Sequence, residues 1–121
     1  MAVVTFDFDD TLLQTLRDRN HGVVEGGPNE PMIALLWTHV VAGDEIHIVT
    51  SRHESFEGHP NRTAVADFVR EHALPVAGIH FTNGKPKAAT LQWLGSIMHF
   101  DDDITELALL ADGCKGVLVP V

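Results

Sequence analysis

Five short segments rich in Val, Ile or Phe recur along the chain, each separated from the next by a longer stretch. Short apolar runs of this kind are typical of strands that are buried on both faces of a parallel sheet. The segments span residues 2–8, 46–50, 76–82, 97–100 and 116–119. We therefore expect five parallel strands joined by crossover connections.

The stretches between these segments carry the spacing of helices. One apolar stripe at helical period comprises Ile33, Leu36, Trp37, Val40 and Val41. Gly43 follows this stripe as a C-terminal stop, and three further helices are expected at 61–74, 87–94 and 104–112. Alternating strands and helices predict an α/β fold with a doubly wound, Rossmann-like sheet and helices on both of its faces.

The segment from Leu12 to Pro31 is polar and rich in Gly and Pro, which predicts a long loop or flap after the first strand. Each of the other intervals has room for one helix, so no cap domain is expected and the site should be open. With 121 residues, 45% of them hydrophobic, the chain is expected to form a single domain over residues 1–121.

The net charge and the N-terminal residues argue against a protein that binds nucleic acid broadly and against a secreted or membrane protein. The formal net charge of −9 disfavours broad binding to nucleic acid, which depends on many Lys and Arg contacts. The N-terminus lacks a basic region and Asp7 interrupts its apolar stretch, so we expect neither a signal peptide nor a membrane span, and a cytoplasmic protein. The single cysteine, Cys114, cannot form an intramolecular disulfide and is interpreted as a packing residue.

Two acidic runs follow apolar segments directly. They comprise Asp7, Asp9 and Asp10, and then Asp101, Asp102 and Asp103. The carboxyl ends of parallel strands are where α/β sheets bind their ligands. Carboxylates that converge there raise one another's pKa unless cations neutralise them, and hard oxygen ligands suit Mg²⁺. The sequence therefore predicts a magnesium site at this edge of the sheet.

Three motifs at strand ends carry a family resemblance. They are FDFDDTLL at 6–13, IHIVTSR at 46–52 and MHFDDD at 98–103. In this order they resemble the motifs of the haloacid dehalogenase superfamily of phosphatases, in its small, minimal-cap form. That family places a lysine before the last motif, and here both Lys85 and Lys87 qualify. We prefer Lys87, which precedes Asp101 by 14 positions, the spacing expected of compact members.

The resemblance implies a phosphatase mechanism. Asp7 is expected to attack phosphorus and form an aspartyl phosphate, and Asp9 to protonate the leaving group and then activate water. Thr50 and Lys87 are expected to stabilise the charge on the transferred phosphoryl group. The implied Mg²⁺ ligands are the Asp7 carboxylate, the Asp9 backbone carbonyl and the Asp101 carboxylate, with Asp102 orienting the metal's waters. Contacts to the substrate are expected from Thr11, Ser51, Arg52 and Lys85.

The basic residues support an anionic substrate. Six of the eight follow the carboxyl ends of the first three predicted strands: Arg17, Arg19, Arg52, Arg62, Lys85 and Lys87. The stretch TSRHESFEGHPNRT at 50–63 is also similar to the phosphatase half of polynucleotide end-processing enzymes. The expected partner is therefore a phosphorylated small molecule, such as a nucleotide, or the phosphorylated end of a nucleic acid. His53 and His59 flank the presumed mouth, where either a substrate contact or a solvated surface role fits.

Alternatives stay open at this point. Asp10 and Asp103 have an equal claim to a structural role as caps. A receiver-like signalling module shares the length, the sheet and the acids, although its phosphoacceptor follows the third strand, whereas here the second acidic run follows the fourth. A catalytically silent phosphate-binding regulatory domain is the remaining alternative.

Overall fold

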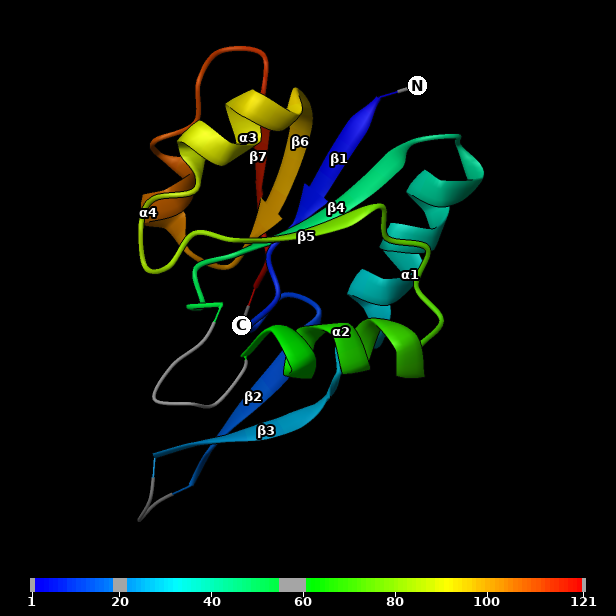
Figure 1. Cartoon of the computed structure of the whole chain (residues 1–121), viewed down its shortest axis with the longest axis vertical. Helices are drawn as coiled ribbons and strands as arrows, with labels where there is room; N and C mark the ends of the chain where they lie inside the picture. The colour runs from blue at the N-terminus through cyan, green and yellow to red at the C-terminus, as the bar shows by residue number, and fades with distance from the viewer. Residues whose placement is uncertain (1, 19–21, 55–60, 121) are drawn as a thin grey trace.

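The computed structural model describes residues 2–18, 22–54 and 61–120. A parallel sheet forms its centre, with the strands in the order β5-β4-β1-β6-β7 (Figure 1). These strands are β1 (Val3–Phe6), β4 (Glu45–Thr50), β5 (Gly78–Phe81), β6 (Ser96–Asp101) and β7 (Lys115–Leu118). The predicted five-stranded parallel sheet is confirmed, with small shifts of the strand ends.

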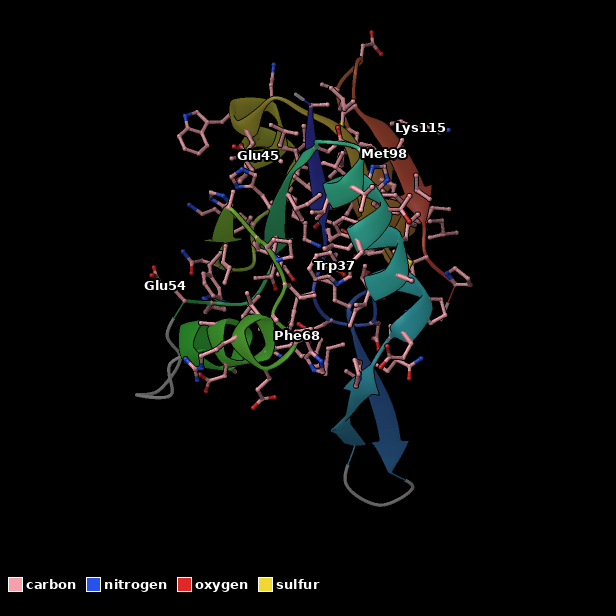
Figure 2. All side chains as sticks on the ribbon, turned by 90° about the vertical axis from the view of Figure 1, so that its right-hand side faces the viewer. Trp37, Glu45, Glu54, Phe68, Met98 and Lys115 are labelled. Carbon is pink, nitrogen blue, oxygen red and sulfur yellow. The ribbon has the colours of Figure 1, made fainter. Side chains whose placement is uncertain are left out.

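Helices occupy the crossover connections of this sheet. They are α1 (Glu30–Val41), α2 (Asn61–Glu71), α3 (Ala88–Leu94) and α4 (Ile104–Leu107). Because such crossovers are right-handed and the strand order reverses at β1, α1 and α2 cover one face and α3 and α4 the other. Figure 2, viewed from the side of α1, shows this helix in front of the sheet. The doubly wound α/β fold is thus confirmed, and no cap domain interrupts the described residues.

The length and composition of the helices bear on the question of a membrane span. None of the helices in the described ranges has the length and apolar character needed to cross a membrane.

The apolar stripe of α1 is only partly buried. Ile33 and Leu36 are buried, whereas Trp37, labelled in Figure 2, is 40% exposed and Val41 is 85% exposed. The stripe therefore seals the sheet along one side of the helix only, and its two outer members face solvent.

The central strand β1 fixes the position of the site. Val4, Thr5 and Phe6 are all buried, and the Phe6 ring stacks on Phe100 of β6 with centroids 4.6 Å apart. The strand order reverses beside β1, and ligands of such sheets bind in the crevice at this point of reversal. Just past the strand, the backbone N–H of Asp7 donates to the Phe100 carbonyl at 2.8 Å. The carboxyl ends of β1 and β6 are therefore held side by side.

The segment 12–31, predicted as a loop or flap, is instead a β-hairpin that leads into α1. Its strands β2 (Leu13–Asp18) and β3 (Gly22–Pro28) pair antiparallel and project away from the main sheet (Figures 1 and 2). The paired residues Thr15–Glu25 and Leu16–Val24 include the β-branched Thr15 and Val24, which favour strands. The Gly and Pro residues of this segment concealed that tendency in the sequence. Of the two alternatives, the long loop was therefore wrong, because the segment contains two paired strands.

A tight turn joins β1 to this hairpin. The amides of Thr11, Leu12 and Leu13 all donate to the carbonyl of Phe8, at 3.3, 3.0 and 3.0 Å. Asp10 lies in the left-handed region with φ of 60°, and its side-chain Oδ1 accepts from the Thr15 amide at 3.0 Å. Because the Phe8 carbonyl serves the turn, β1 ends before the predicted limit at residue 8.

The last helix is shorter than predicted. α4 ends at Leu107 instead of continuing to residue 112. The amides of Leu109 and Leu110 donate to carbonyls three residues earlier, at 3.2 and 3.4 Å, so the chain tightens into turns. This compact connection leads directly to β7.

Candidate active site

The two acidic runs meet where β1 and β6 end. A pocket of about 150 Å³ lies at this point of the sheet. Its lining comprises Asp7, Asp9, Asp10, Ser51, Lys87, Asp101, Asp102, Asp103 and Glu106. Both acidic runs therefore line one pocket, as predicted. Glu106, in the first turn of α4, also lines this pocket and was not predicted as a site residue.

Lys87 lies at the centre of this cluster. Its Nζ donates to Asp7 Oδ1 at 2.9 Å and to Asp101 Oδ2 at 2.6 Å, and its side chain is 3% exposed. Its backbone N–H donates to Glu106 Oε2 at 2.9 Å, which fixes the start of α3. Lys85, in contrast, has an exposed side chain, and its backbone carbonyl accepts from the Thr82 hydroxyl at 2.7 Å. The preferred lysine is the one that contacts the acidic cluster.

The cluster distributes its charge unevenly. Burial raises the pKa of Asp7 well above its ordinary value; Lys87 opposes this shift and the Asp101 carboxylate adds to it. Burial also acts to raise the pKa of Asp101, but hydrogen bonds from His99 and Lys87 outweigh it and bring the pKa to about 2. Burial lowers the pKa of Lys87, but the two carboxylates overcome this effect and the net shift is upward. Asp101 therefore holds its negative charge, and Asp7 is the carboxylate that binds a proton more readily.

The buried His99 contacts Asp101, and the sequence had not indicated this role. His99 is 0% exposed, its Nε2 lies 2.9 Å from Asp101 Oδ2, and its Nδ1 lies 2.8 Å from the hydroxyl of Thr5. Thr5 in turn contacts the Ser96 hydroxyl at 2.9 Å. An ionised carboxylate only accepts hydrogen bonds, so His99 donates from Nε2 and holds Asp101 in one orientation. The available signal was spacing, because residues two apart on a strand share a face.

The first acidic run has two different environments. The Asp7 carboxylate accepts from the Thr11 hydroxyl at 3.1 Å, and Thr11 is fully buried. Thr11, expected to contact the substrate, is thus placed to orient Asp7. Asp9 is more exposed and accepts from both Nε and Nη2 of Arg52, at 2.8 and 2.7 Å. Arg52, another expected substrate contact, is engaged with the predicted acid and base in this structure.

The end of β4 supplies the remaining predicted groups. Thr50 is fully buried, and its hydroxyl oxygen accepts from the backbone N–H of Arg52 at 3.2 Å. A hydroxyl that accepts in this way still has its own proton to donate. Ser51 is exposed and lines the pocket. Ser51 therefore lies at the pocket, whereas Thr50, at the end of the adjacent strand β4, is not among the residues that line it.

The outer members of the two runs have structural roles. Asp103 caps α4 and accepts from the amide and hydroxyl of Thr105, at 2.9 and 2.6 Å. Asp10 binds the amide and hydroxyl of Thr15 and so anchors the hairpin, which is a different function from the helix cap considered for it. The structural alternative therefore accounts for the contacts of both residues.

Other candidates fall at the margin of the described structure. The side chain of Arg17, together with Arg19, His59 and the side chain of Arg62, lies outside the described residues. His53 is described and its side chain is exposed. The expected ring of cations around the site is therefore represented by Arg52, Lys85 and Lys87 alone among the described side chains.

The site has a donor set that fits a divalent cation. Asp7, Asp101 and Asp102 each present a carboxylate oxygen, and these atoms lie within 4.8 Å of one another. Burial raises the pKa of Asp102 as it does that of Asp7, and Lys87 balances only one of the three possible negative charges. Hard oxygen donors with excess negative charge suit Mg²⁺. Asp102 was expected to orient the metal's waters, and Asp9, whose backbone carbonyl was an expected ligand, lines the same pocket.

No protein-family model matches the chain, and a search of curated proteins finds no match.

The buried histidine should contribute strongly to stability. We expect His99→Leu to lower the free energy of unfolding by about 2–4 kcal/mol, because Asp101 and Thr5 each lose a buried hydrogen-bond partner. His99→Gln retains an N–H donor and should lose distinctly less. Urea unfolding monitored by circular dichroism measures both variants, and equal losses would contradict the role assigned to the Asp101 hydrogen bond.

Asp7 should make stability depend on pH in the metal-free protein. Its pKa is raised in the folded state, so its contribution is fully present below the ordinary value of 3.8 and is lost as pH rises through the folded pKa. The Asp7→Asn variant lacks this titration. We therefore expect the variant to gain stability relative to the wild type between about pH 4 and pH 7. Urea unfolding with EDTA at several pH values measures this difference, and a constant difference would contradict the assignment.

Proposed function

We propose that this protein is a Mg²⁺-dependent phosphomonoester hydrolase that works through an aspartyl phosphate on Asp7. The observation that carries the proposal is the buried Asp7–Lys87–Asp101 cluster at the joined ends of β1 and β6. Asp102 adjoins this cluster as a third carboxylate. Two further observations support the same reaction. The cluster lies where the strand order reverses, and the motifs of the sequence resemble those of haloacid dehalogenase phosphatases.

Asp7 has the position that a nucleophile needs. Thr11 and Lys87 hold the two oxygens of its carboxylate in separate hydrogen bonds, which limits its rotation. Bound by Asp7, Asp101 and Asp102, Mg²⁺ would supply the positive charge that keeps these carboxylates ionised and offsets charge on the phosphoryl group. Lys87 would add a second fixed positive charge beside the transferred group.

The reaction proceeds in two balanced halves. In the first, an Asp7 oxygen bonds to phosphorus, the bond from phosphorus to the leaving oxygen breaks, and protonated Asp9 gives its proton to that oxygen. In the second, Asp9 takes a proton from water as the water oxygen bonds to phosphorus and the Asp7–phosphorus bond breaks. The Thr50 hydroxyl, whose proton is available, would donate to a phosphoryl oxygen in both halves.

Arg52 must change partner during this cycle. It holds both oxygens of Asp9, so Asp9 can reach the leaving oxygen only after this pair separates or shifts. An anionic substrate offers Arg52 a replacement for the carboxylate, and a guanidinium binds phosphate in the same two-point manner. Substrate binding would therefore release Asp9 for proton transfer and occupy Arg52 at the same time.

The receiver-like alternative has the wrong topology. Receiver modules of the CheY type have their strands in the order 2-1-3-4-5. Here the five strands of the main sheet, numbered along the chain, lie in the order 3-2-1-4-5. This difference favours the phosphatase over a receiver.

Loss of the nucleophile should remove activity. We expect Asp7→Asn to lower kcat by roughly 10³-fold or more, because an amide is nearly isosteric with the carboxylate but is a poor nucleophile. Asp112→Asn, an exposed Asp outside the active-site pocket, is the matched control and should keep its activity. Phosphate release from a panel of phosphomonoesters measures both, and full activity in Asp7→Asn would end the proposal.

Activity should depend on a divalent cation held by Asp101. Chelation should abolish turnover and Mg²⁺ should restore it, whereas Ca²⁺ should bind but support little turnover because its coordination is larger and looser. Asp101→Ala should weaken Mg²⁺ binding, measured by calorimetry, more than Thr50→Ala does. Equal affinities in the two variants would contradict the assignment of Asp101 as a ligand.

A further inference from the structure

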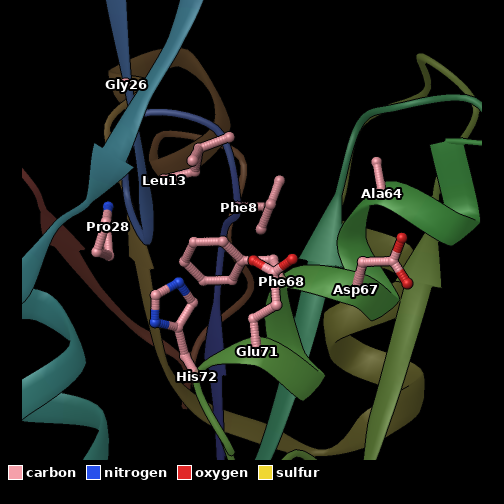
Figure 3. Close-up of a pocket in the computed structure, with 9 residues that line it drawn as sticks. All are labelled: Phe8, Leu13, Gly26, Pro28, Ala64, Asp67, Phe68, Glu71 and His72. Atoms are coloured by element: carbon pink, nitrogen blue, oxygen red, sulfur yellow. The ribbon is translucent and has the colours of Figure 1, made fainter.

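A second cavity lies between the base of the β2–β3 hairpin and α2. Its volume is about 430 Å³, which is within the range of pockets that hold a small organic ligand. Figure 3 shows Leu13 and Pro28 on the hairpin side and Ala64, Asp67 and Phe68 on the α2 side. None of the described side chains of this cavity takes part in the proposed chemistry.

The cavity and the active-site pocket share a wall. Along the turn after β1, Asp7, Asp9 and Asp10 line the active-site pocket, while Phe8 and Leu13 line the cavity. The Arg52 guanidinium lies 5.1 Å from the centre of the Phe8 ring and also pairs with Asp9. The oxygen of a leaving group must lie next to Asp9 to receive its proton. The rest of that leaving group therefore lies on the side of the active site where the cavity begins.

The interior of the cavity suits a flat group. The Phe8 and Phe68 rings meet edge to face at 5.1 Å, and the His72 ring lies 4.4 Å from that of Phe68. Leu13 and Pro28 add apolar surface on the opposite side. Phe8 and Phe68 are themselves buried, so their rings close the floor of the cavity, and a planar ligand would lie against this floor.

The rim of the cavity suits hydrogen-bond donors. Asp67 and Glu71, one helical turn apart on α2, both line it, and ionised carboxylates only accept hydrogen bonds. Arg70 pairs with Asp67, but its side chain is 75% exposed and does not line the cavity. The two carboxylates therefore disfavour a second phosphate at this place and favour an N–H group.

We propose that this cavity binds the leaving group of the substrate, and that this group is a nucleoside whose base carries an exocyclic amino group. The proposal rests on the phosphatase activity proposed above. A planar base fits the aromatic walls, and its amino group can donate to the carboxylate of Asp67 or Glu71. A simple ammonium group would satisfy the carboxylates but would leave most of this volume unfilled.

A steric block tests the location. Ala64 is exposed on α2 and lines the cavity, so Ala64→Phe fills it without cutting into the core. Ala89→Phe makes the same change at an exposed position of α3 outside the cavity. We expect Ala64→Phe to lower kcat/KM for cytidine 5′-monophosphate at least about tenfold relative to that for acetyl phosphate, whose leaving group is too small to reach the cavity. Ala89→Phe should leave this ratio unchanged, and equal ratios in the two variants would overturn the location.

A change of hydrogen-bonding character tests the ligand class. The wild type should prefer cytidine 5′-monophosphate to uridine 5′-monophosphate, which carries a carbonyl where cytidine has an amino group, and both to ribose 5-phosphate. Glu71→Gln adds an N–H donor and should reduce the preference for cytidine over uridine several-fold. Equal kcat/KM for all three in the wild type would overturn the proposal.

Two readouts separate this proposal from the activity on which it rests. If acetyl phosphate is hydrolysed but the base has no effect, the cavity proposal fails and the phosphatase stands. If no phosphate ester or acetyl phosphate is hydrolysed, the proposed function fails, and cytidine alone then decides the cavity. Its binding should shift the amide NMR signals of Ala64, Phe68 and His72 in the wild type but not those of Ala64→Phe, and unshifted signals in the wild type would overturn the site.

Discussion

The ammonium of Lys87 joins two carboxylates that would otherwise repel each other. It lies within hydrogen-bond distance of Asp7 after β1 and of Asp101 at the end of β6, and it belongs to the residue that begins α3. Two carboxylates at adjacent strand ends, both almost fully buried, are unstable without such a counter-charge. This one charge therefore holds Asp7, Asp101 and the residue before α3 together at the centre of the site.

The groups behind the two carboxylates explain why they behave differently. Asp101 accepts hydrogen bonds from Lys87, His99 and the Asp103 amide, so its charge is well compensated. Asp7 has Lys87 and the weaker hydroxyl of Thr11. The Asp101 carboxylate is therefore a fixed anion, which suits a metal ligand. The Asp7 carboxylate has fewer hydrogen-bond donors around it and is less strongly held. A nucleophile must break and remake its contacts, so the less compensated position is the one that suits it.

Local pattern was sufficient for the main sheet and for the centre of the site. Short apolar runs predicted the strands, and the acidic residues after two of these runs predicted a site at the edge of the sheet, because parallel strands end at a common edge. The β2–β3 hairpin was not predicted, because the pairing of residues such as Leu16 with Val24 is not visible in a local pattern and the segment is rich in Gly and Pro. His99 escaped for a different reason: its role depends on Thr5 in another strand, and strand adjacency had not been derived.

The turn after β1 gives the hairpin a direct influence on chemistry. The turn in residues 7–13 is built around the Phe8 carbonyl, and it contributes Asp7, Asp9 and Asp10 to the active-site pocket and Phe8 and Leu13 to the second cavity. Asp10 bonds to Thr15 of β2, so a displacement of the hairpin pulls on the same turn that carries Asp9. A ligand held between the hairpin and α2 would therefore stabilise the position of Asp9, the proposed general acid. No cap domain is present in the described residues, so this short covalent connection is the most direct link between the second cavity and the active-site pocket.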